Sequence, residues 1–411
     1  VKVTRTAGNV RSAGFALNEI ATIYVKQGLH ERAAAQYQKV LSFFESIGDL
    51  RGQATTLNSY GDFLLQLGKN QKALELYNRA LPLSEKVEDE DIRTTTLYNL
   101  ARINLKLGTT NAALAFIQQS LKVIEDLRST VRSPEFRATY FSGVQKHYEL
   151  CIEILTQLDK LRPGEHFAAQ ALLISEKNRS RLLLDLVNES RANIREGAAK
   201  ELLDQERRLR GLIQLQAQYR MDLLLSGKNS TEISVVESEL AQLKVQYQEV
   251  EAQLRQRNPR LLSLEQSAPL TLEQIQKELR DSNTMLLEYS LGDERSYLWA
   301  VTADSFQTFE LPSRKTIEDV SREGYNAMTA RQGALDNQYQ NNLEAADKLD
   351  FETRGKLGKM LLGSLAGQLG NRRLLVVTEG ALQYVPFDAL ILPNASSDSK
   401  APILETNEVV V

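Results

Sequence analysis

The sequence predicts a mainly α-helical protein in three parts: an α-solenoid, an antiparallel helical hairpin and a partial α/β domain. A forty-residue repeat fills the first part, and a heptad pattern of apolar residues marks the second. Short apolar runs separated by turn residues mark the third. These patterns place the solenoid in residues 1–192, the hairpin in residues 193–265 and the α/β part in residues 266–411.

The composition is that of a folded protein without a strong overall charge. The 411 residues are enough for two or three domains. Hydrophobic residues make up 42%, and the formal net charge of -3 gives no general attraction for nucleic acid or an anionic membrane. Cys151 is the only cysteine, and no apolar run has transmembrane length. We expect a cytoplasmic protein without a nucleic-acid or membrane partner.

Both ends of the sequence resemble cut ends. The chain begins with Val1 instead of methionine, and it stops within the β-branched run of residues 409–411. Such a run is typical of a strand, and a strand that stops in mid-run is an unusual natural terminus. We therefore expect the chain to be a fragment of a longer protein.

The repeat is defined by glycines at Gly28, Gly68 and Gly108. A glycine can end a helix in the left-handed conformation at no steric cost. An alanine five residues later lets two helices approach closely, and large apolar residues fill the space between them. One such pair cannot bury its apolar stripe alone, so copies are expected to stack. Three further positions recur with the glycines. They are the alanines five residues later (Ala33, Ala73 and Ala113), the large apolar residues nine residues later (Tyr37, Tyr77 and Ile117) and the leucines eleven residues earlier (Leu17, Leu57 and Leu97).

With these residues the chain resembles the tetratricopeptide repeat family over residues 10–190. A fourth, degenerate unit follows Pro163 and Gly164. In this family the first helix of each pair lines a concave groove, and mixed polar groups there suit an extended peptide. The alternative is that each such residue belongs to a solvated helix face. The groove lacks the cluster of Lys, Arg and Asn that clamps a C-terminal carboxylate. By register the candidates are Asn18, Thr22, Lys26, Asn58, Asp62, Gln66, Tyr98, Arg102 and Lys106.

The middle part has the apolar spacing of a coiled-coil seam. A polar segment at residues 226–231 separates two such stripes, which indicates a chain reversal. The two helices of the hairpin can bury their apolar stripes against each other. We favour this intramolecular pairing over a dimer, and weak self-association stays an alternative. The first stripe is Leu202, Leu209, Leu212, Tyr219 and Leu223, and the second is Val236, Leu240, Leu243, Tyr247, Val250 and Leu254.

The third part begins after Pro269 and predicts strands at residues 285–291, 297–301, 306–311 and 373–378. A helix is expected at residues 315–331, followed by a polar segment to residue 349 and a second helix before the last strand. Residues 373–378 form the continuous apolar run of a buried parallel strand. We therefore expect a partial α/β domain here.

This third part resembles the opening of a CHAT domain, a caspase-like cysteine-protease domain often fused behind tetratricopeptide repeats. The resemblance rests on Glu379-Gly380 followed by a Leu-x-Tyr-x-Pro-Phe-x-x-Leu motif at residues 382–390. Residues 286–293 and 176–186 are also similar to the family. Bacterial members are regulated proteases controlled through helical arms. The family's catalytic histidine and cysteine lie beyond the Pro-Phe segment, and this chain stops before both.

The chain's own reactive residues do not form a predicted active site. His147 and Cys151 share a helix face, but the context of Cys151 predicts a small buried hydrophobic residue. The three histidines, His30, His147 and His166, are scattered and offer no metal-ligand set. We expect no cofactor, no metal and no catalytic residue in this chain.

The predicted function is therefore a protein-binding arm with the leading part of a CHAT-family protease. The arm would recruit a substrate or regulate proteolysis, and the remainder of the CHAT domain would be a second partner. The alternative is a non-catalytic adaptor whose CHAT-like part is a pseudo-protease.

Overall fold

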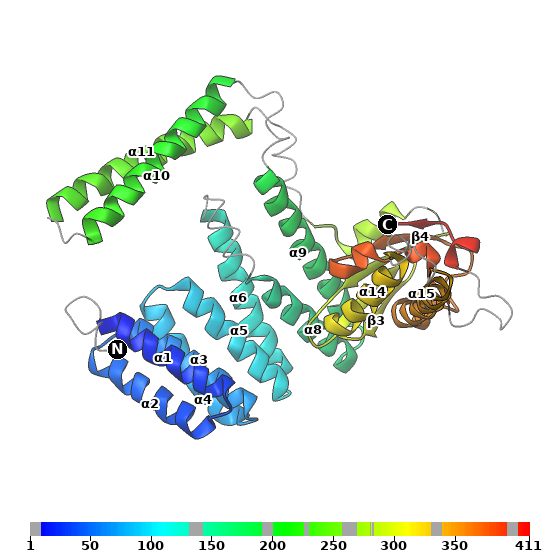
Figure 1. Cartoon of the computed structure of the whole chain (residues 1–411), viewed down its shortest axis with the longest axis horizontal. Helices are drawn as coiled ribbons and strands as arrows, with labels where there is room; N and C mark the ends of the chain where they lie inside the picture. Colours follow the sequence, from blue (N-terminus) through cyan, green and yellow to red (C-terminus); the bar gives the residue numbers. More distant parts are fainter. Residues whose placement is uncertain are drawn as a thin grey trace. The chain divides into compact units, whose positions relative to one another are not determined.

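The computed structural model describes residues 10–130, 143–190, 200–225, 230–256, 269–279, 281, 283–329, 339–392 and 402–411. The chain forms two compact units, Val1–Asn178 together with Leu270–Val411, and Arg179–Pro269. The predicted fold class is confirmed: the chain is mostly helical, with a solenoid-like helix array and a small mixed sheet (Figure 1). The predicted domain boundaries stay a prediction.

The helix array makes up the N-terminal part of the first unit, and we call it the arm. Helices α1 to α6 pack as antiparallel pairs joined by short turns (Figure 1). The helices are α1 (Val10–Lys26), α2 (His30–Ser46), α3 (Leu50–Gln66), α4 (Asn70–Lys86), α5 (Glu90–Lys106), α6 (Thr110–Thr130), α8 (Gln145–Leu161) and α9 (Phe167–Ser190), the last of which crosses into the second unit.

The repeat glycines end the first helix of each pair as predicted. Gly28, Gly68 and Gly108 have φ of 72°, 71° and 79°, in the left-handed region that favours glycine. Gly164 (φ 95°) makes the same turn between α8 and α9, where the degenerate fourth unit was expected. The turn between α4 and α5 places Glu88 in this conformation at φ 51°. A non-glycine residue there costs about 1 kcal/mol.

Aromatic rings fill the space between helices because glycines leave room for them. A Cβ atom built on Gly52 would lie 2.2 Å from Cδ1 of Phe44, and one on Gly61 would lie 2.4 Å from Cε1 of Tyr77. Phe44 and Tyr77 are both fully buried at 0% exposure. These glycines therefore serve packing within a helix, a role distinct from that of the turn glycines.

Ion pairs at the N-terminal ends of the helices tie each repeat to the next. Asp49 caps α3 by accepting a hydrogen bond from the backbone N–H of Gly52, and Arg11 of the preceding repeat pairs with Asp49 at 2.5 Å. Arg51 pairs with Asp89, the cap of α5, at 2.9 Å. The same arginine–aspartate link thus recurs with the forty-residue period.

The second unit is the predicted helical hairpin. Helices α10 (Lys200–Leu225) and α11 (Ser230–Gln256) pack along an apolar seam (Figure 1). The four residues 226–229 of the predicted turn and the side chain of Leu254 lie outside the described residues. The seam contains the predicted Leu202, Leu209, Leu223, Val236, Leu240, Leu243, Tyr247 and Val250.

Two predicted seam positions in α10 are wrong. Leu212 and Tyr219 are 41% and 52% exposed, and Ile213 packs in the seam instead. The heptad register runs through Glu206, which is 4% exposed and receives hydrogen bonds from Arg210 and from the Tyr247 hydroxyl. A charged residue at a seam position hid this register, because a seam is expected to be apolar.

The C-terminal part of the first unit holds a five-stranded sheet with the order β3-β2-β1-β4-β5. Strand β1 pairs antiparallel with β2 and parallel with β4, so the sheet is mixed. The strands are β1 (Thr284–Ser290), β2 (Ser296–Val301), β3 (Phe306–Leu311), β4 (Arg373–Val377) and β5 (Val409–Val410). The helices beside them are α13 (Leu272–Glu278), α14 (Arg314–Thr329) and α15 (Tyr339–Leu362). Helix α15 begins at Tyr339, within the polar segment that was predicted to reach residue 349.

Both faces of the sheet are covered by helices. Side chains on one strand alternate between faces, so Leu298 and Ala300 of β2 join a cluster with α14 and α15. Tyr297, Trp299 and Val301 of the same strand join a cluster with α8, α9 and α13. The last helix pair of the arm is therefore one of the two helical layers of the sheet. Among the described helices, none has both the length and the hydropathy of a membrane-spanning segment.

Replacing Gly61 with alanine is expected to destabilise the arm by about 2 kcal/mol. The new Cβ would displace the buried Tyr77 ring, and two further ring atoms lie at 2.8 and 2.9 Å from its position. Urea denaturation followed by circular dichroism measures the free energy of unfolding.

Gly355→Ala is the matched control in the same unit, because this helical glycine has no atom within 4 Å of a built Cβ. It is expected to gain about 0.5–1 kcal/mol from helix propensity. Equal effects of the two substitutions would contradict the packing role of Gly61.

Candidate peptide-binding cleft

We call the first helix of each pair in the arm, α1, α3, α5 and α8, an inner helix. One cleft, within the first unit, opens along these inner helices. Its volume is about 750 Å³. Helices α3, α5 and α8 supply most of its lining, and the turn between strands β1 and β2 supplies the rest. The lining residues are Asp62, Leu65, Gln66, Tyr98, Arg102, Leu105, Lys106, Lys146, Glu149, Leu150, Glu153, Gln157, Gly292, Asp293, Glu294 and Arg295.

The nine residues predicted for the groove fall into two groups. Five line the cleft, and these belong to the second and third repeats: Asp62, Gln66, Tyr98, Arg102 and Lys106. The other four lie elsewhere on the inner helices: Asn18, Thr22, Lys26 and Asn58.

Asn18 and Asn58 are buried between neighbouring repeats. The Asn58 amide donates to the Thr96 hydroxyl at 2.7 Å and receives the Asn99 amide at 3.3 Å. The Asn18 amide donates to the Ser59 hydroxyl at 3.3 Å. These amides occupy the position that the register assigned to the groove, but the helices pack so closely there that the side chains meet the next helix. They link repeats.

Thr22 and Lys26 lie on α1, outside the cleft. The Thr22 hydroxyl is hydrogen-bonded to the Tyr37 hydroxyl at 3.2 Å, within the first helix pair. Lys26 is exposed at the end of α1. Neither residue adds to the lining of the cleft.

Asp62 organises the arm side of the cleft. Its carboxylate accepts a hydrogen bond from the Tyr77 hydroxyl at 2.8 Å and another from the guanidinium of Arg102. Burial and the neighbouring Asp62 raise the pKa of Tyr77, so the phenol stays neutral and acts as a donor. Arg102 is thereby fixed between repeats with part of its side chain facing the cleft.

Tyr98 presents an aromatic surface flanked by two cations. The Lys146 ammonium lies 4.9 Å from its ring centroid and the Arg102 guanidinium 5.6 Å from it. The imidazole of His147 packs at 4.8 Å between centroids. Burial, and then Lys146, lower the pKa of His147 to about 3, so this ring is neutral and bonds Ser120 at 2.9 Å.

The sequence prediction missed the α8 and turn residues of the cleft. Glu149 and Glu153 lie one helical turn apart on α8, which is the first helix of the degenerate fourth unit. The groove register applied to that unit gives Ile154, Leu158 and Arg162, which do not line the cleft, so it does not find these two glutamates. No sequence pattern indicates that residues 292–295 meet the arm, because that contact depends on tertiary packing.

Glu149 connects the arm with the C-terminal part. Its carboxylate pairs with Arg314 of α14 at 2.5 Å, and Arg314 also donates to the backbone carbonyl of Leu291 at 2.5 Å. Burial raises the pKa of Glu149 to about 7, against the opposing effect of Arg314. The carboxylate next to the turn is therefore one that changes charge near neutral pH.

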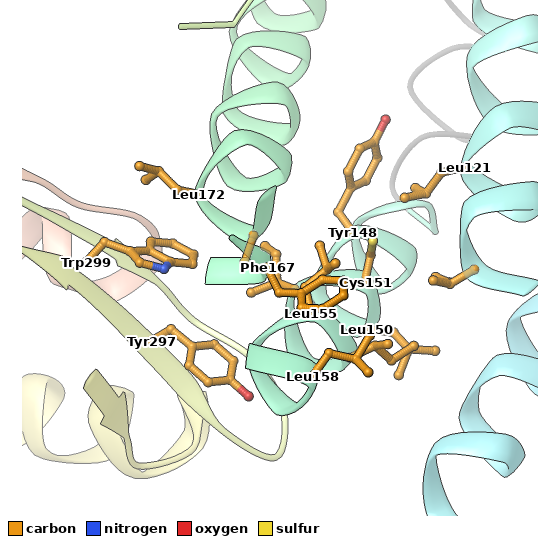
Figure 2. Close-up of a cluster of buried hydrophobic side chains, with 14 of the residues drawn as sticks. Leu121, Tyr148, Leu150, Cys151, Leu155, Leu158, Phe167, Leu172, Tyr297 and Trp299 are labelled. Atoms are coloured by element: carbon orange, nitrogen blue, oxygen red, sulfur yellow. The ribbon is translucent and has the colours of Figure 1, made fainter. Parts of the chain in front are cut away.

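The turn is held against the arm by a shared apolar cluster. Trp299 is 0% and Tyr297 3% exposed, and both follow the turn on strand β2. Figure 2 shows them facing side chains of α8 and α9, among them Leu155, Leu158, Phe167 and Leu172.

Cys151 lies inside the same cluster (Figure 2). Its side chain is 1% exposed, and burial raises the pKa of its thiol to about 12. His147 sits on the same helix but bonds Ser120. A thiol in this environment is neutral and inaccessible. In the part of the chain that the structure describes, no group of three His, Cys, Asp or Glu residues is arranged to hold a metal ion.

Glu149→Gln is expected to change how stability depends on pH. The folded-state pKa of about 7 exceeds the reference value of 4.5, so between these values the folded state binds more protons than the unfolded state. The Glu149 contribution to stability is thus present at low pH and is lost as pH rises through this window. Relative to Glu149→Gln, the wild type should lose on the order of 2 kcal/mol between pH 4.5 and 7.

Denaturant titrations at several pH values measure this difference, with the exposed Glu75→Gln as control. A constant difference between wild type and Glu149→Gln across the window would show that burial does not perturb this carboxyl.

Comparison with known proteins supports the assignment of tetratricopeptide repeats to the arm. The family described as the tetratricopeptide repeat matches residues 12–86 and 52–126. Two solved structures are similar at low identity. One is the structure of putative kinesin light chain nearly identical TPR-like repeats of Podosopora anserina, which is 15% identical, covers 62% of this chain and 98% of that chain, and has a TM-score of 0.28. The other is Pseudomonas aeruginosa PilF, which is 16% identical, covers 56% of this chain and 99% of that chain, and has a TM-score of 0.21. No curated protein matches. The family match confirms the predicted tetratricopeptide repeats over residues 12–126.

Proposed function

We propose that the chain binds an extended segment of a partner protein in the cleft between the arm helices and the β1–β2 turn. The observation that carries this proposal is the lining of the cleft, in which an aromatic ring, Tyr98, lies among charged groups such as Lys146 and the Arg102–Asp62 ion pair. An extended peptide needs partners for its backbone N–H and C=O groups, and such a lining offers both donors and acceptors.

The size and rigidity of the cleft also suit a peptide. Its volume of about 750 Å³ is in the range of ligand-binding clefts. Arg102 is fixed by Asp62, and Tyr98 by packing on His147, so little side-chain freedom is lost on binding. Proteins with tetratricopeptide repeats commonly bind protein partners.

We further propose that residues 266–411 are the leading part of a caspase-like CHAT domain, and that the arm recruits or regulates a substrate of the parent protease. A mixed sheet whose central strands β1 and β4 are parallel, with helices on both faces, supports this proposal. The partner in this case includes the remainder of that domain. The competing proposal is a non-catalytic adaptor with a pseudo-protease domain.

Arg102→Gln is expected to weaken peptide binding at least tenfold. A peptide-display library selected on the immobilised chain supplies the probes, and fluorescence anisotropy of the tightest peptide measures the dissociation constant. The substitution removes a cation from the cleft but keeps the length and polarity of the side chain.

Lys26→Gln is the matched control, because Lys26 is exposed on the first repeat, outside the cleft. It should leave the dissociation constant unchanged. If both variants bind like the wild type, or if no peptide is selected, the cleft is not the binding surface.

The chain is expected to cleave no protein substrate through Cys151, because its thiol is buried and its pKa is raised to about 12. Incubation with a fluorogenic unfolded protein, comparing wild type with Cys151→Ala, is the measurement. Cleavage by the wild type that disappears in the variant would overturn the assignment of Cys151 as a structural residue.

A further inference from the structure

Helix α10 of the hairpin carries two apolar stripes. The buried stripe, with Leu209 and Ile213, packs against α11 (Figure 1). The second stripe consists of Leu212, Leu215 and Tyr219, whose side chains are 41%, 65% and 52% exposed. These residues follow one another at spacings of three and four, so they lie on one face of the helix. Scattered exposed apolar residues are normal, but a contiguous stripe on a hairpin that already has a seam indicates an interaction surface.

The exposed surface continues from α10 onto α11. The Gln216 amide of α10 donates to the carboxylate of Glu239 of α11 at 2.7 Å, which marks the side of the seam that this surface borders. Val235 precedes Glu239 by one helical turn and is 54% exposed. Tyr219 follows Gln216 by one turn, and the two helices run antiparallel, so Val235 and Tyr219 lie at the same end of the surface.

The stripe on α10 is complementary to a second copy of itself. Arg208 is also exposed and precedes Leu212 by four residues, so the stripe reads Arg208, Leu212, Leu215 and Tyr219 with spacings of four, three and four. These spacings are the same in both directions along the helix. Two antiparallel copies of α10 therefore place Leu212 against Leu215 of the second copy, and Arg208 against its Tyr219.

Charge complementarity also favours a second copy as the occupant. A guanidinium over a tyrosine ring is an attractive pair, and the symmetry of the arrangement forms this pair twice. The exposed carboxylate of Glu239 borders the same surface one turn from the Tyr219 end, so an incoming Arg208 finds an anion near the ring. A two-fold dimer requires such a self-complementary patch, whereas an unrelated partner requires no symmetry in the stripe.

We propose that two copies of the chain associate through the stripe formed by Arg208, Leu212, Leu215 and Tyr219, as an antiparallel dimer with two-fold symmetry. The seam of each hairpin stays intramolecular, and Leu212 and Tyr219, which do not belong to that seam, take their apolar contacts from the second copy. The stripe is small beside the roughly 20–30 residues that each side of a standard interface contributes, so the dimer is weak and reversible.

Sedimentation velocity of the full chain measures this association from about 10 μM to about 1 mM, the range in which a small interface forms. The wild type should shift from monomer to dimer as concentration rises. Leu215→Glu should weaken the dimer at least tenfold, because symmetry places two new charges in the apolar centre of the interface. A wild type that stays monomeric, or a folded Leu215→Glu variant that dimerises like the wild type, would overturn the proposal.

Val245→Glu is the matched control. Val245 of α11 is also 54% exposed, but it lies nine residues after the seam residue Val236, about two and a half helical turns, and therefore on the opposite face of the helix. This variant should dimerise within twofold of the wild type. Equal weakening by both glutamates would mean that the loss comes from added charge and would sink the assignment of the surface. Circular dichroism checks that each variant is folded.

Introduced cysteines test the antiparallel orientation independently. The native Cys151 is 1% exposed, so an exposed new thiol is the one that reacts. Under mild oxidation, a mixture of tagged Arg208→Cys and untagged Tyr219→Cys chains should form mixed disulfides. Each variant alone should not, because its two thiols would lie eleven residues apart along the helix axes, about 16 Å, whereas a disulfide needs Cα atoms within about 7 Å. Disulfides within each variant in place of mixed ones would contradict this orientation.

Discussion

The structure depends on one apolar layer that two parts of the chain share. Strand β2 lies inside the sheet between β1 and β3, and its outer face carries Tyr297, Trp299 and Val301. Helices α8 and α9 cover this face, and the same helices continue the repeat array. Burying an aromatic side chain such as Trp299 contributes about 2–3 kcal/mol. Separating the arm from the sheet would expose this layer, so the two parts are stable as one unit.

The cleft follows from that packing. Because α8 is fixed against β2, the turn that precedes β2 is placed beside the inner helices of the arm. The ion pair between Arg314 and Glu149 joins the same two parts at the edge of the cleft. The inner helices alone would offer an open polar surface, whereas the turn closes part of it.

Local sequence patterns predicted the array well, and tertiary contacts limited the rest. The glycine, alanine and aromatic spacing is set by steric requirements that act within one helix pair, so Gly28 and Tyr77 could be assigned from sequence. The register also identified Tyr98 and Arg102 as cleft residues. It could not show that Asn58 meets the next repeat, because that depends on how closely the helices stack.

The hairpin shows the same limit in another form. A heptad pattern was evident from Val236 to Val250, but Glu206 concealed the register of α10. A buried carboxylate is acceptable there because Arg210 and Tyr247 donate to it. Residues 292–295 have the polar pattern of a hairpin turn, but that pattern does not show that the turn lines the cleft, because the contact depends on the strand that follows it.

The hairpin also interrupts a unit whose two segments, Val1–Asn178 and Leu270–Val411, fold together. In topological terms it is an insertion. The entropic penalty for closing an inserted loop grows only slowly with its length, by roughly 0.6 kcal/mol for each doubling. A change in the length of this segment should therefore have little effect on the free energy of the surrounding fold.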